Sequence, residues 1–247
     1  MSGHSKWNNI KRKKEKTDGQ RAKIFTKIGR EIAVAVKEGG ADPNNNSRLK
    51  DLIAKAKANN VPNDNIDRCI KKAAGGGSGS DYETIFYEGY GPCGVAVIVE
   101  TLTDNRNRTA GDVRHYFDKF GGNLGQLGCV SFLFSRKGMI VIPNEGKDEE
   151  TLMEDVFEAG ADDFNVEDDV VEVFTDPTQL SAVRSALENK GYSFESVEEN
   201  YIPSTYTAIE DPDLVIKMQR LLEALEDNDD VQNVWHNWDA PEEEDED

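Results

Sequence analysis

A run of glycine and serine at residues 75–80 (GGGSGS) divides this chain into two parts of different character. Such runs behave as flexible linkers and mark domain boundaries. Before the linker, apolar residues recur at three- and four-residue spacing, which indicates amphipathic helices, whereas short β-rich runs alternate with helices after it. The charge divides at the same place: residues 1–75 hold 18 Lys and Arg against 8 Asp and Glu, and the rest holds 11 against 40. The sequence therefore predicts a basic helical domain joined to an acidic body.

The length and the cysteine content limit what this chain can be. Its 247 residues suffice for one large domain or for two to three small ones. Cys69, Cys93 and Cys129 lie far apart without a C-x-x-C pair, which argues against a disulfide framework or a zinc module and favours a reducing compartment. Neither a secretory signal nor an apolar run of the roughly 20 residues that cross a bilayer is evident. We expect a cytoplasmic protein without a membrane partner.

The basic part, residues 1–77, is predicted to be all helical with an N-terminal arm. A first helix should begin near Thr17 or Asp18, either of which can cap it, and end at about Glu38 before two glycines. The Asp42-Pro43 pair signals a second helix, because proline suits a first helical turn. A third helix should begin at residue 63 or 64, and its Cys69 is expected to fill the core.

The acidic part is predicted to form two α/β domains. Strands at 138–143, 164–166, 170–175 and 194–201, with helices at 149–158 and 178–189, give the β-α-β-β-α-β order of a ferredoxin-like domain. The elements before and after this ferredoxin-like run, including a separate strand at 130–135, are each an incomplete half and together make one domain. We therefore expect an α+β protein in which domain III (137–201) is inserted into domain II (81–136 plus 202–240), followed by a disordered acidic tail at 241–247.

Two groups of cations in the basic part are candidates for nucleic-acid binding. The arm combines a stacking residue with a run of positive charge, and the first helix carries a cationic edge beside its apolar stripe. A solvated charge run without a specific partner would have the same composition, but few acidic residues interrupt these cations, so we favour phosphate contact. The candidates are Lys6, Trp7, Lys11, Arg12, Lys13, Lys14, Lys23, Lys27 and Arg30.

A second candidate anion site lies in the acidic part, where residues 103–109 (TDNRNRT) lead into a helix. A helix N-terminus with Asn and Arg side chains can bind an anion, which makes Arg106 and Arg108 candidates. The glycine-rich segment 121–128 that follows this helix could admit close backbone approach. Helix capping combined with surface ion pairs explains the same residues equally well.

No pattern in the sequence points to catalysis, to a cofactor or to a metal. Residues 89–94 (GYGPCG) satisfy G-x-G-x-x-G formally, but a strand follows them rather than a helix, so they predict a hairpin turn. The three histidines, His4, His115 and His236, have no zinc-ligand spacing. We expect a protein that is not an enzyme.

Short motifs along nearly the whole chain form a specific combination. They are GHSKW (3–7), KIFTK (23–27), REI (30–32), ANN (58–60), YEGYGP (87–92), TDNRNRT (103–109), GGNLG (121–125), ALED (224–227) and DVQNV (230–234). In these motifs the chain resembles the YebC/PmpR family, which includes a mitochondrial translational activator of cytochrome oxidase subunit I. Cys93 stands where that family usually has glycine.

The resemblance implies a helical domain followed by two α/β domains, the third inserted into the second, and no catalysis. Family members have been described as DNA-binding transcriptional regulators and, in other cases, as translation factors for ribosomes stalled at proline-rich stretches. Our first hypothesis is accordingly a DNA-binding transcriptional regulator. The alternatives are a translation factor that binds ribosomal or transfer RNA, with the ribosome as a further candidate partner, and an acidic protein-interaction scaffold. Neither the target nor the oligomeric state follows from the sequence.

Overall fold

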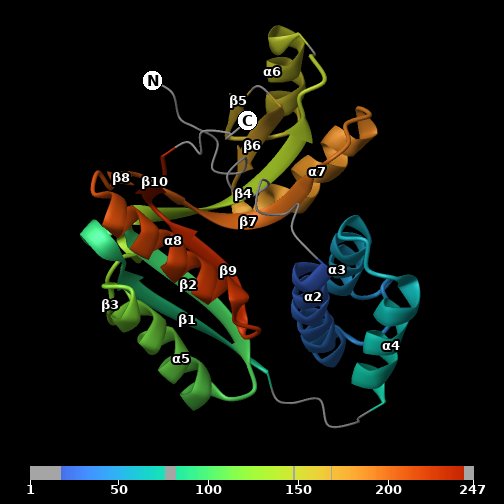
Figure 1. Ribbon diagram of the computed structural model, residues 1–247. Helices are drawn as coiled ribbons and strands as arrows, with labels where there is room; N and C mark the ends of the chain where they lie inside the picture. The colour runs from blue at the N-terminus through green and yellow to red at the C-terminus, as the bar shows by residue number, and fades with distance from the viewer. Residues whose placement is uncertain (1–17, 76–81, 147, 168, 242–247) are drawn as a thin grey trace. The chain divides into compact units, whose positions relative to one another are not determined.

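The computed structural model describes residues 18–75, 82–146, 148–167 and 169–241 (Figure 1). These residues form two compact units. Among the described residues, the first unit is the segment 132–204. The second unit combines the described residues from 18 to 131 with those from 205 onward. One unit is thus inserted into the sequence of the other.

Three helices open the second unit: α2 (Asp18–Gly39), α3 (Ser47–Ala58) and α4 (Asn63–Ala74). They enclose a core to which α2 contributes Ile28, Ile32 and Ala35 and α3 contributes Leu49, while Cys69 packs against it as expected. The predicted start of the second helix at Pro43 is wrong.

The reason lies in the capping of α3. Asp42 accepts hydrogen bonds from the side chains of Asn44 and Asn45 and holds residues 42–45 in a turn. Asn46 then caps the helix by accepting a hydrogen bond from the amide of Leu49 at 3.0 Å. The helix therefore begins at Ser47, because its cap is Asn46 rather than an upstream residue.

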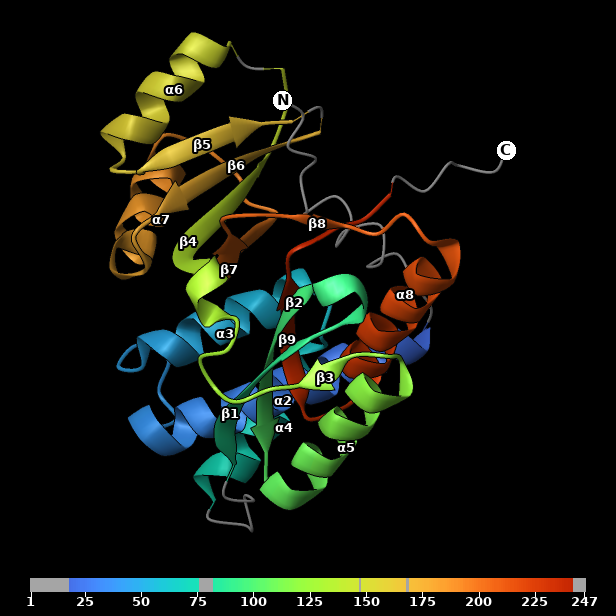
Figure 2. The same cartoon turned by 90° about the vertical axis from the view of Figure 1, so that its left-hand side faces the viewer.

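A four-stranded antiparallel sheet forms the rest of the second unit. Its strands are β1 (Glu83–Tyr90), β2 (Ala96–Thr103), β3 (Asn123–Leu124) and β9 (Val231–His236), in the order β3-β1-β2-β9. Helices α5 (Arg106–Lys119) and α8 (Pro212–Asp227) cover one face of this sheet (Figure 2). Their buried side chains, such as Phe117 and Leu221, pack on Val97 and Val99 of β2. A short 3-10 turn, η1 (Pro92–Gly94), joins β1 to β2, and β8 (Thr207–Ala208) pairs in parallel with β10 (Trp238–Asp239).

The first unit has the β-α-β-β-α-β order that the sequence predicts. Its elements are β4 (Phe134–Pro143), α6 (Glu149–Glu158), β5 (Asp163–Val166), β6 (Val170–Thr175), η3 (Pro177–Gln179), α7 (Leu180–Asn189) and β7 (Ser196–Pro203). All neighbouring strands are antiparallel, in the order β5-β6-β4-β7. The core lies between the sheet and the two helices. This arrangement confirms the predicted α+β class with ferredoxin-like order.

The strand predicted at 138–143 is confirmed as part of β4, but the separate strand predicted at 130–135 is wrong. Residues Ser131–Leu133 form a 3-10 turn, η2, and β4 then runs without a break through Gly138. A Cβ on Gly138 would lie 2.6 Å from Oγ1 of Thr175 and 3.0 Å from Cβ of Leu180. Gly138 therefore permits close packing inside a strand, whereas the sequence pattern predicts it as the start of one.

Candidate nucleic-acid interface

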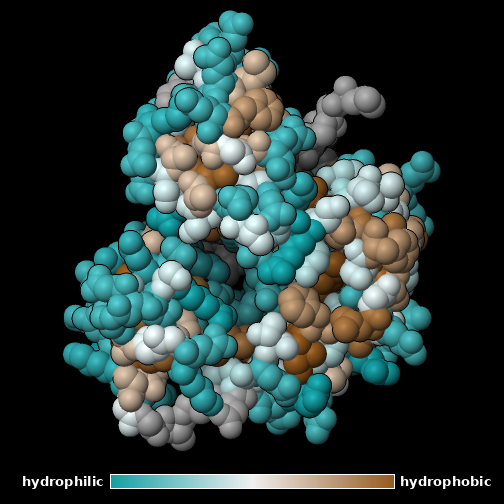
Figure 3. Space-filling view, turned by 180° about the vertical axis from the view of Figure 1, so that it is seen from behind, coloured by the Kyte–Doolittle hydropathy of each residue, from teal (hydrophilic) through white to brown (hydrophobic). Residues whose placement is uncertain are grey.

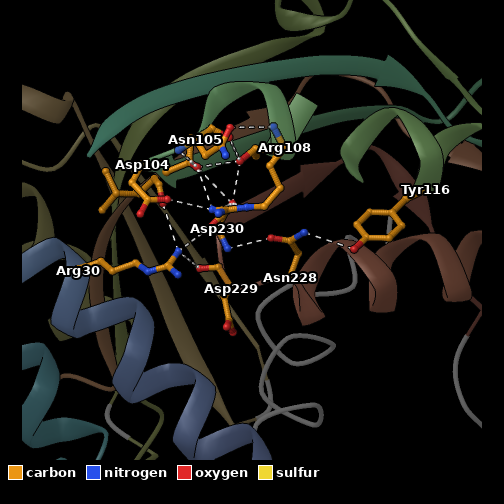
Figure 4. Close-up of polar contacts among 11 residues, drawn as sticks. Arg30, Asp104, Asn105, Arg108, Tyr116, Asn228, Asp229 and Asp230 are labelled. Carbon is orange, nitrogen blue, oxygen red and sulfur yellow. Dashed lines mark hydrogen bonds and ion pairs between the residues drawn. The ribbon is translucent and has the colours of Figure 1, made fainter. Parts of the chain in front are cut away.

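The carboxylate of Asp230 is the centre of a polar cluster in the second unit (Figure 4). Asp230 precedes β9 and is only 3% exposed. Its Oδ1 accepts a hydrogen bond from Arg30 at 2.7 Å, and its Oδ2 accepts bonds from Arg108 and from the hydroxyl of Thr109, each at 2.7 Å. Burial raises the pKa of Asp230, but the bonds from Arg108, Thr109 and Arg30 outweigh it and hold the pKa below its usual value. Asp230 is therefore ionised at neutral pH.

The segment 103–109 places Arg108 and Thr109 by means of a helix cap. Asn105 precedes α5 and accepts a hydrogen bond from the amide of Arg108 at 3.1 Å. Arg108 also pairs with Asp104 at 3.1 Å, and its hydrogen bonds to Asp230 and Asp104 raise the pKa of its guanidinium. Arg106, by contrast, reaches Glu83 only at 3.8 Å, and 66% of its side chain is exposed. Of the two arginines, Arg108 is tied into the protein and Arg106 is the more accessible.

The cationic edge of α2 contacts residues 226–230, which comprise the last two residues of α8 and the three residues before β9, and which we call the acidic loop. Lys23 pairs with Asp227 at 2.8 Å, and Lys27 donates to the carbonyl oxygen of Glu226 at 2.8 Å. Arg30 donates to the carbonyl oxygen of Asp229 at 2.7 Å in addition to the Asp230 carboxylate. Its guanidinium also lies 5.6 Å from the centre of the Tyr82 ring.

Burial affects the charge of Lys27. Desolvation is the largest influence and lowers the pKa of its ammonium, although Glu226 and Asp229 act in the opposite direction. The Lys23–Asp227 pair is partly exposed and contributes little to stability, while the Arg30–Asp230 pair is mostly withdrawn from water. The predicted cationic edge of α2 is thus present, and its three cations have protein partners.

The structure brings only part of the predicted site together. Arg30 and Arg108, from opposite sides of the glycine-serine linker, meet on Asp230, and Lys23 and Lys27 lie along the same acidic loop. Arg106 instead faces Glu83 of β1. The predicted arm residues Lys6, Trp7, Lys11, Arg12, Lys13 and Lys14 lie outside the described residues.

Sequence reasoning missed Asp230 and the acidic loop as partners of α2. One sequence feature could have indicated them: the acidic run at 226–230, where a helix gives way to a strand, lies far along the chain from the cations of the basic part. Asn228 shapes this loop by accepting a hydrogen bond from the amide of Asp230 at 2.8 Å, and its side chain in turn donates to the hydroxyl of Tyr116 at 3.3 Å.

The glycine-rich segment 121–128 packs against its own protein. A Cβ on Gly122 would lie 2.6 Å from the carbonyl oxygen of Tyr90, and one on Gly89 would lie 2.6 Å from that of Asn123. Buried Glu88 accepts hydrogen bonds from the amides of Val130 and Ser131, each at 2.9 Å, and fixes the end of the segment. Burial raises the pKa of Glu88, but these amide bonds prevail and lower it. The close backbone approach that glycine allows here is between β1 and β3.

The G-x-G-x-x-G pattern is a hairpin turn, as predicted. Tyr90 of β1 pairs with Ala96 of β2, and the amide of Gly91 donates to the carbonyl oxygen of Val95 at 2.7 Å. Within the described part of the chain, no His, Cys, Asp and Glu side chains group as three or more possible metal ligands. Among the same residues, no helix is both long and apolar enough to cross a membrane.

Comparison with known proteins places this fold in a family. Residues 5–76 match the model described as the TACO1/YebC protein N-terminal domain, and residues 82–238 match that of the TACO1/YebC second and third domain. A relative from Ruminiclostridium cellulolyticum is 61% identical over all of both chains, and one from Acetivibrio thermocellus is 59% identical over 96% of this chain and 99% of its own. Both are named "Probable transcriptional regulatory protein".

A solved structure agrees with this assignment. The crystal structure of a conserved hypothetical protein from Aquifex aeolicus superposes with a TM-score of 0.83 at 46% identity, over 93% of this chain and 94% of its own. The chain belongs to the TACO1/YebC family. The family and the names of its relatives indicate a regulatory rather than a catalytic protein.

Proposed function

We propose that this protein is a non-enzymatic regulator of gene expression that binds DNA through its basic N-terminal part. The observation that carries the proposal is the separation of charge: 18 of the 29 Lys and Arg residues lie in the first 75 residues of a chain whose net charge is −19. A phosphate backbone is attracted to the basic part and repelled by the acidic part. The names of the relatives agree with a role in transcription.

The proposed contacts are those of the arm, of α2 and of the α5 N-terminus: Lys6, Trp7, Lys11, Arg12, Lys13, Lys14, Lys23, Lys27, Arg30, Arg106 and Arg108. Trp7 would stack and the cations would bind phosphate oxygens. Because Lys23, Lys27 and Arg30 already contact the acidic loop, nucleic acid must compete with Asp227 and its neighbours for these three side chains. The arm would then make the first contacts, and α2 would follow.

An RNA-binding translation factor is the second candidate. The cations of α2 contact the acidic loop, and the sequence marks no recognition helix with Asn, Gln or Arg placed for base edges, so contacts to the backbone should dominate. Backbone contacts suit ribosomal or transfer RNA as well as DNA, and the acidic body would suit the basic proteins of a ribosome. A protein-interaction scaffold is a third candidate that uses the acidic body alone. For each of them we expect a cytoplasmic location without a membrane partner.

The salt dependence of binding tests the proposal. The logarithm of the affinity for duplex DNA, measured by fluorescence anisotropy of the full chain, should fall linearly with the logarithm of the salt concentration, with a slope of about −0.9 per phosphate contact. Replacing Lys11, Arg12, Lys13 and Lys14 by Gln should weaken binding and flatten the slope by about 0.9 for each phosphate that is no longer neutralised.

A matched control removes four exposed cations from α5 and α8: Arg114, Lys119, Lys217 and Arg220, each to Gln. This variant has the same net charge as the arm variant but should keep the wild-type slope. An unchanged slope in the arm variant, or an equal change in both, would rule out the arm as the binding element. Repeating the titration with single-stranded and duplex RNA decides between the first and the second candidate.

A further inference from the structure

The first unit carries exposed apolar side chains beside its core. On α6, Met153 and Phe157 are 41% and 46% exposed, and Val166 at the end of β5 is 37% exposed. The ring of Phe157 meets that of Phe164 edge to face, with centroids 5.7 Å apart. We call Met153, Phe157, Phe164 and Val166 the α6–β5 patch.

Met153, Phe157 and Val166 lie outside the core, whereas Phe164 is partly buried and packs against it. The inward side of α6 is formed by Leu152 and Val156, which are 4% and 0% exposed. Met153 and Phe157 each follow one of these residues, so they project beside the buried stripe and lie one helical turn apart. Phe164 and Val166 are two residues apart in β5, so their side chains lie on the same side of the strand. Since β5 is the edge strand of its sheet, the α6–β5 patch lies at the edge of the unit and is open to solvent.

The surroundings of the patch are strongly acidic. Residues 132–204 hold 18 Asp and Glu against 5 Lys and Arg. Exposed carboxylates flank the patch on α6 and β5, and they are Glu149, Glu150, Glu154, Glu158 and Asp163. Lys190 pairs with Asp155 and Glu158, at 2.7 and 2.5 Å. Figure 3 shows brown side chains bordered by teal ones in the part of the molecule that holds α6 and β5.

We propose that the α6–β5 patch is the docking surface for a basic protein segment that carries apolar side chains among Lys and Arg. The apolar side chains would cover Met153, Phe157 and Val166, and the cations would pair with the flanking carboxylates. Exposed apolar groups rimmed by polar ones mark protein interaction sites, and complementary charge selects the partner. The same carboxylates repel a nucleic-acid backbone and an anionic lipid surface. This surface shares no residue with the proposed nucleic-acid contacts, and it does not depend on them.

The test uses the full chain and a short synthetic peptide of Lys and Arg that carries two Leu residues four positions apart. Chemical-shift mapping of isotope-labelled protein at physiological salt should confine the changes to residues 149–158 and 163–167. The double variant Met153→Ser/Val166→Thr should bind the peptide about tenfold more weakly, since truncating anchors at the centre of an interface typically costs more than 1 kcal/mol. It leaves the Phe157–Phe164 ring contact intact, so that circular dichroism should remain unchanged.

Two controls separate the apolar anchors from the general charge. Ile216→Ser removes a side chain of similar exposure, 45%, from α8 in the other unit and should not alter binding. Glu150→Gln/Glu154→Gln should weaken binding more than Glu188→Gln/Glu195→Gln, an equal change of charge within the same unit. A peptide with Ser in place of Leu should bind about tenfold more weakly.

The proposal is wrong if the Leu and Ser peptides bind equally, or if the shifts spread over all acidic surfaces. It is also wrong if duplex DNA produces the same local shifts. A dimer of the free chain that Met153→Ser/Val166→Thr abolishes in sedimentation would identify a second copy as the occupant and would likewise overturn it. None of these outcomes depends on whether the arm binds nucleic acid.

Discussion

Neutralising the acidic loop should tighten the binding of nucleic acid, because the loop and phosphate compete for the same cations. The variant Glu226→Gln/Asp227→Asn/Asp229→Asn removes three exposed charges beside Lys23, Lys27 and Arg30. It leaves the buried carboxylate of Asp230, and with it the bonds to Arg30 and Arg108, in place. Lys23 then loses its carboxylate partner and the negative charge beside Lys27 and Arg30 falls, while the cluster around Asp230 persists.

The size of the effect follows from the number of cations involved. Counterions condensed on the nucleic acid are released when a protein cation neutralises a phosphate. If that cation first has to leave a carboxylate, the freed carboxylate takes up a cation from solution, so the net release and the contribution to the salt slope are small. Lys23 would lose its carboxylate partner in the variant, while Lys27 would keep its bond to the carbonyl oxygen of Glu226 and Arg30 its bond to Asp230. At about 0.9 per phosphate contact, one new contact steepens the slope of log affinity against log salt by about 0.9.

Fluorescence anisotropy of a labelled duplex over a salt series measures this slope. The control Glu210→Gln/Asp213→Asn/Asp239→Asn changes the net charge equally at exposed positions of the same unit that lie outside the acidic loop. It should raise the affinity slightly through the overall field and leave the slope close to that of the wild type. Equal slopes for the two variants, or a slope no steeper than wild type for the acidic-loop variant, would refute competition between the loop and phosphate.

Three further predictions concern the folded state. Asp230→Ala should lower the free energy of unfolding in urea by about 3 kcal/mol, because it leaves Arg30 and Arg108 without their shared carboxylate; a loss below about 1 kcal/mol would contradict the central role of this side chain. The pKa values of Asp230 and Glu88 are held below those of the unfolded chain, so their contribution to stability is present above about pH 4 and is lost as the pH falls through the folded-state values; urea midpoints that stay level from about pH 5 to about pH 2.5 would disprove it. Gly122→Ala should destabilise the protein more than Gly111→Ala does, since only the former meets a backbone oxygen at 2.6 Å; thermal melts of the two variants decide.

Local pattern was sufficient to predict most of the elements. The apolar spacing of α2, with Ile28 and Ile32 buried, is a signal within one helix and needs no knowledge of the rest of the chain. The β-α-β-β-α-β order of residues 132–204 was likewise readable from alternating periodicities. The errors at Pro43 and at residues 130–135 arose where a single side chain or a packing contact determines where an element begins. Asn46 supplies the cap of α3, and Gly138 allows β4 to continue close to Thr175.

The site was harder to predict because its contacts are long-range. Arg30 and Asp230 are 200 residues apart, and nothing in the local spacing of either residue indicates the other. The cations of α2 could be recognised as a group, but their contact with residues 226–230 depends on how the helices dock on the sheet. Arg108 shows the same difficulty, because a helix-capping segment and an anion-binding site can have the same sequence pattern. Only the structure shows that the Arg108 side chain is bound to the carboxylate of Asp230.

Crosslinking of the full chain to nucleic acid in living cells, followed by sequencing of the bound strands and mapping of the crosslinked peptides, tests the proposed function most directly. We predict that DNA fragments are recovered and that the crosslinked peptides come from residues 1–39, with none from residues 132–204. Recovery of ribosomal or transfer RNA through the same peptides would replace transcription by translation as the process regulated. The absence of any crosslinked nucleic acid, or crosslinks confined to the acidic unit, would contradict the proposal that this protein acts through its basic N-terminal part.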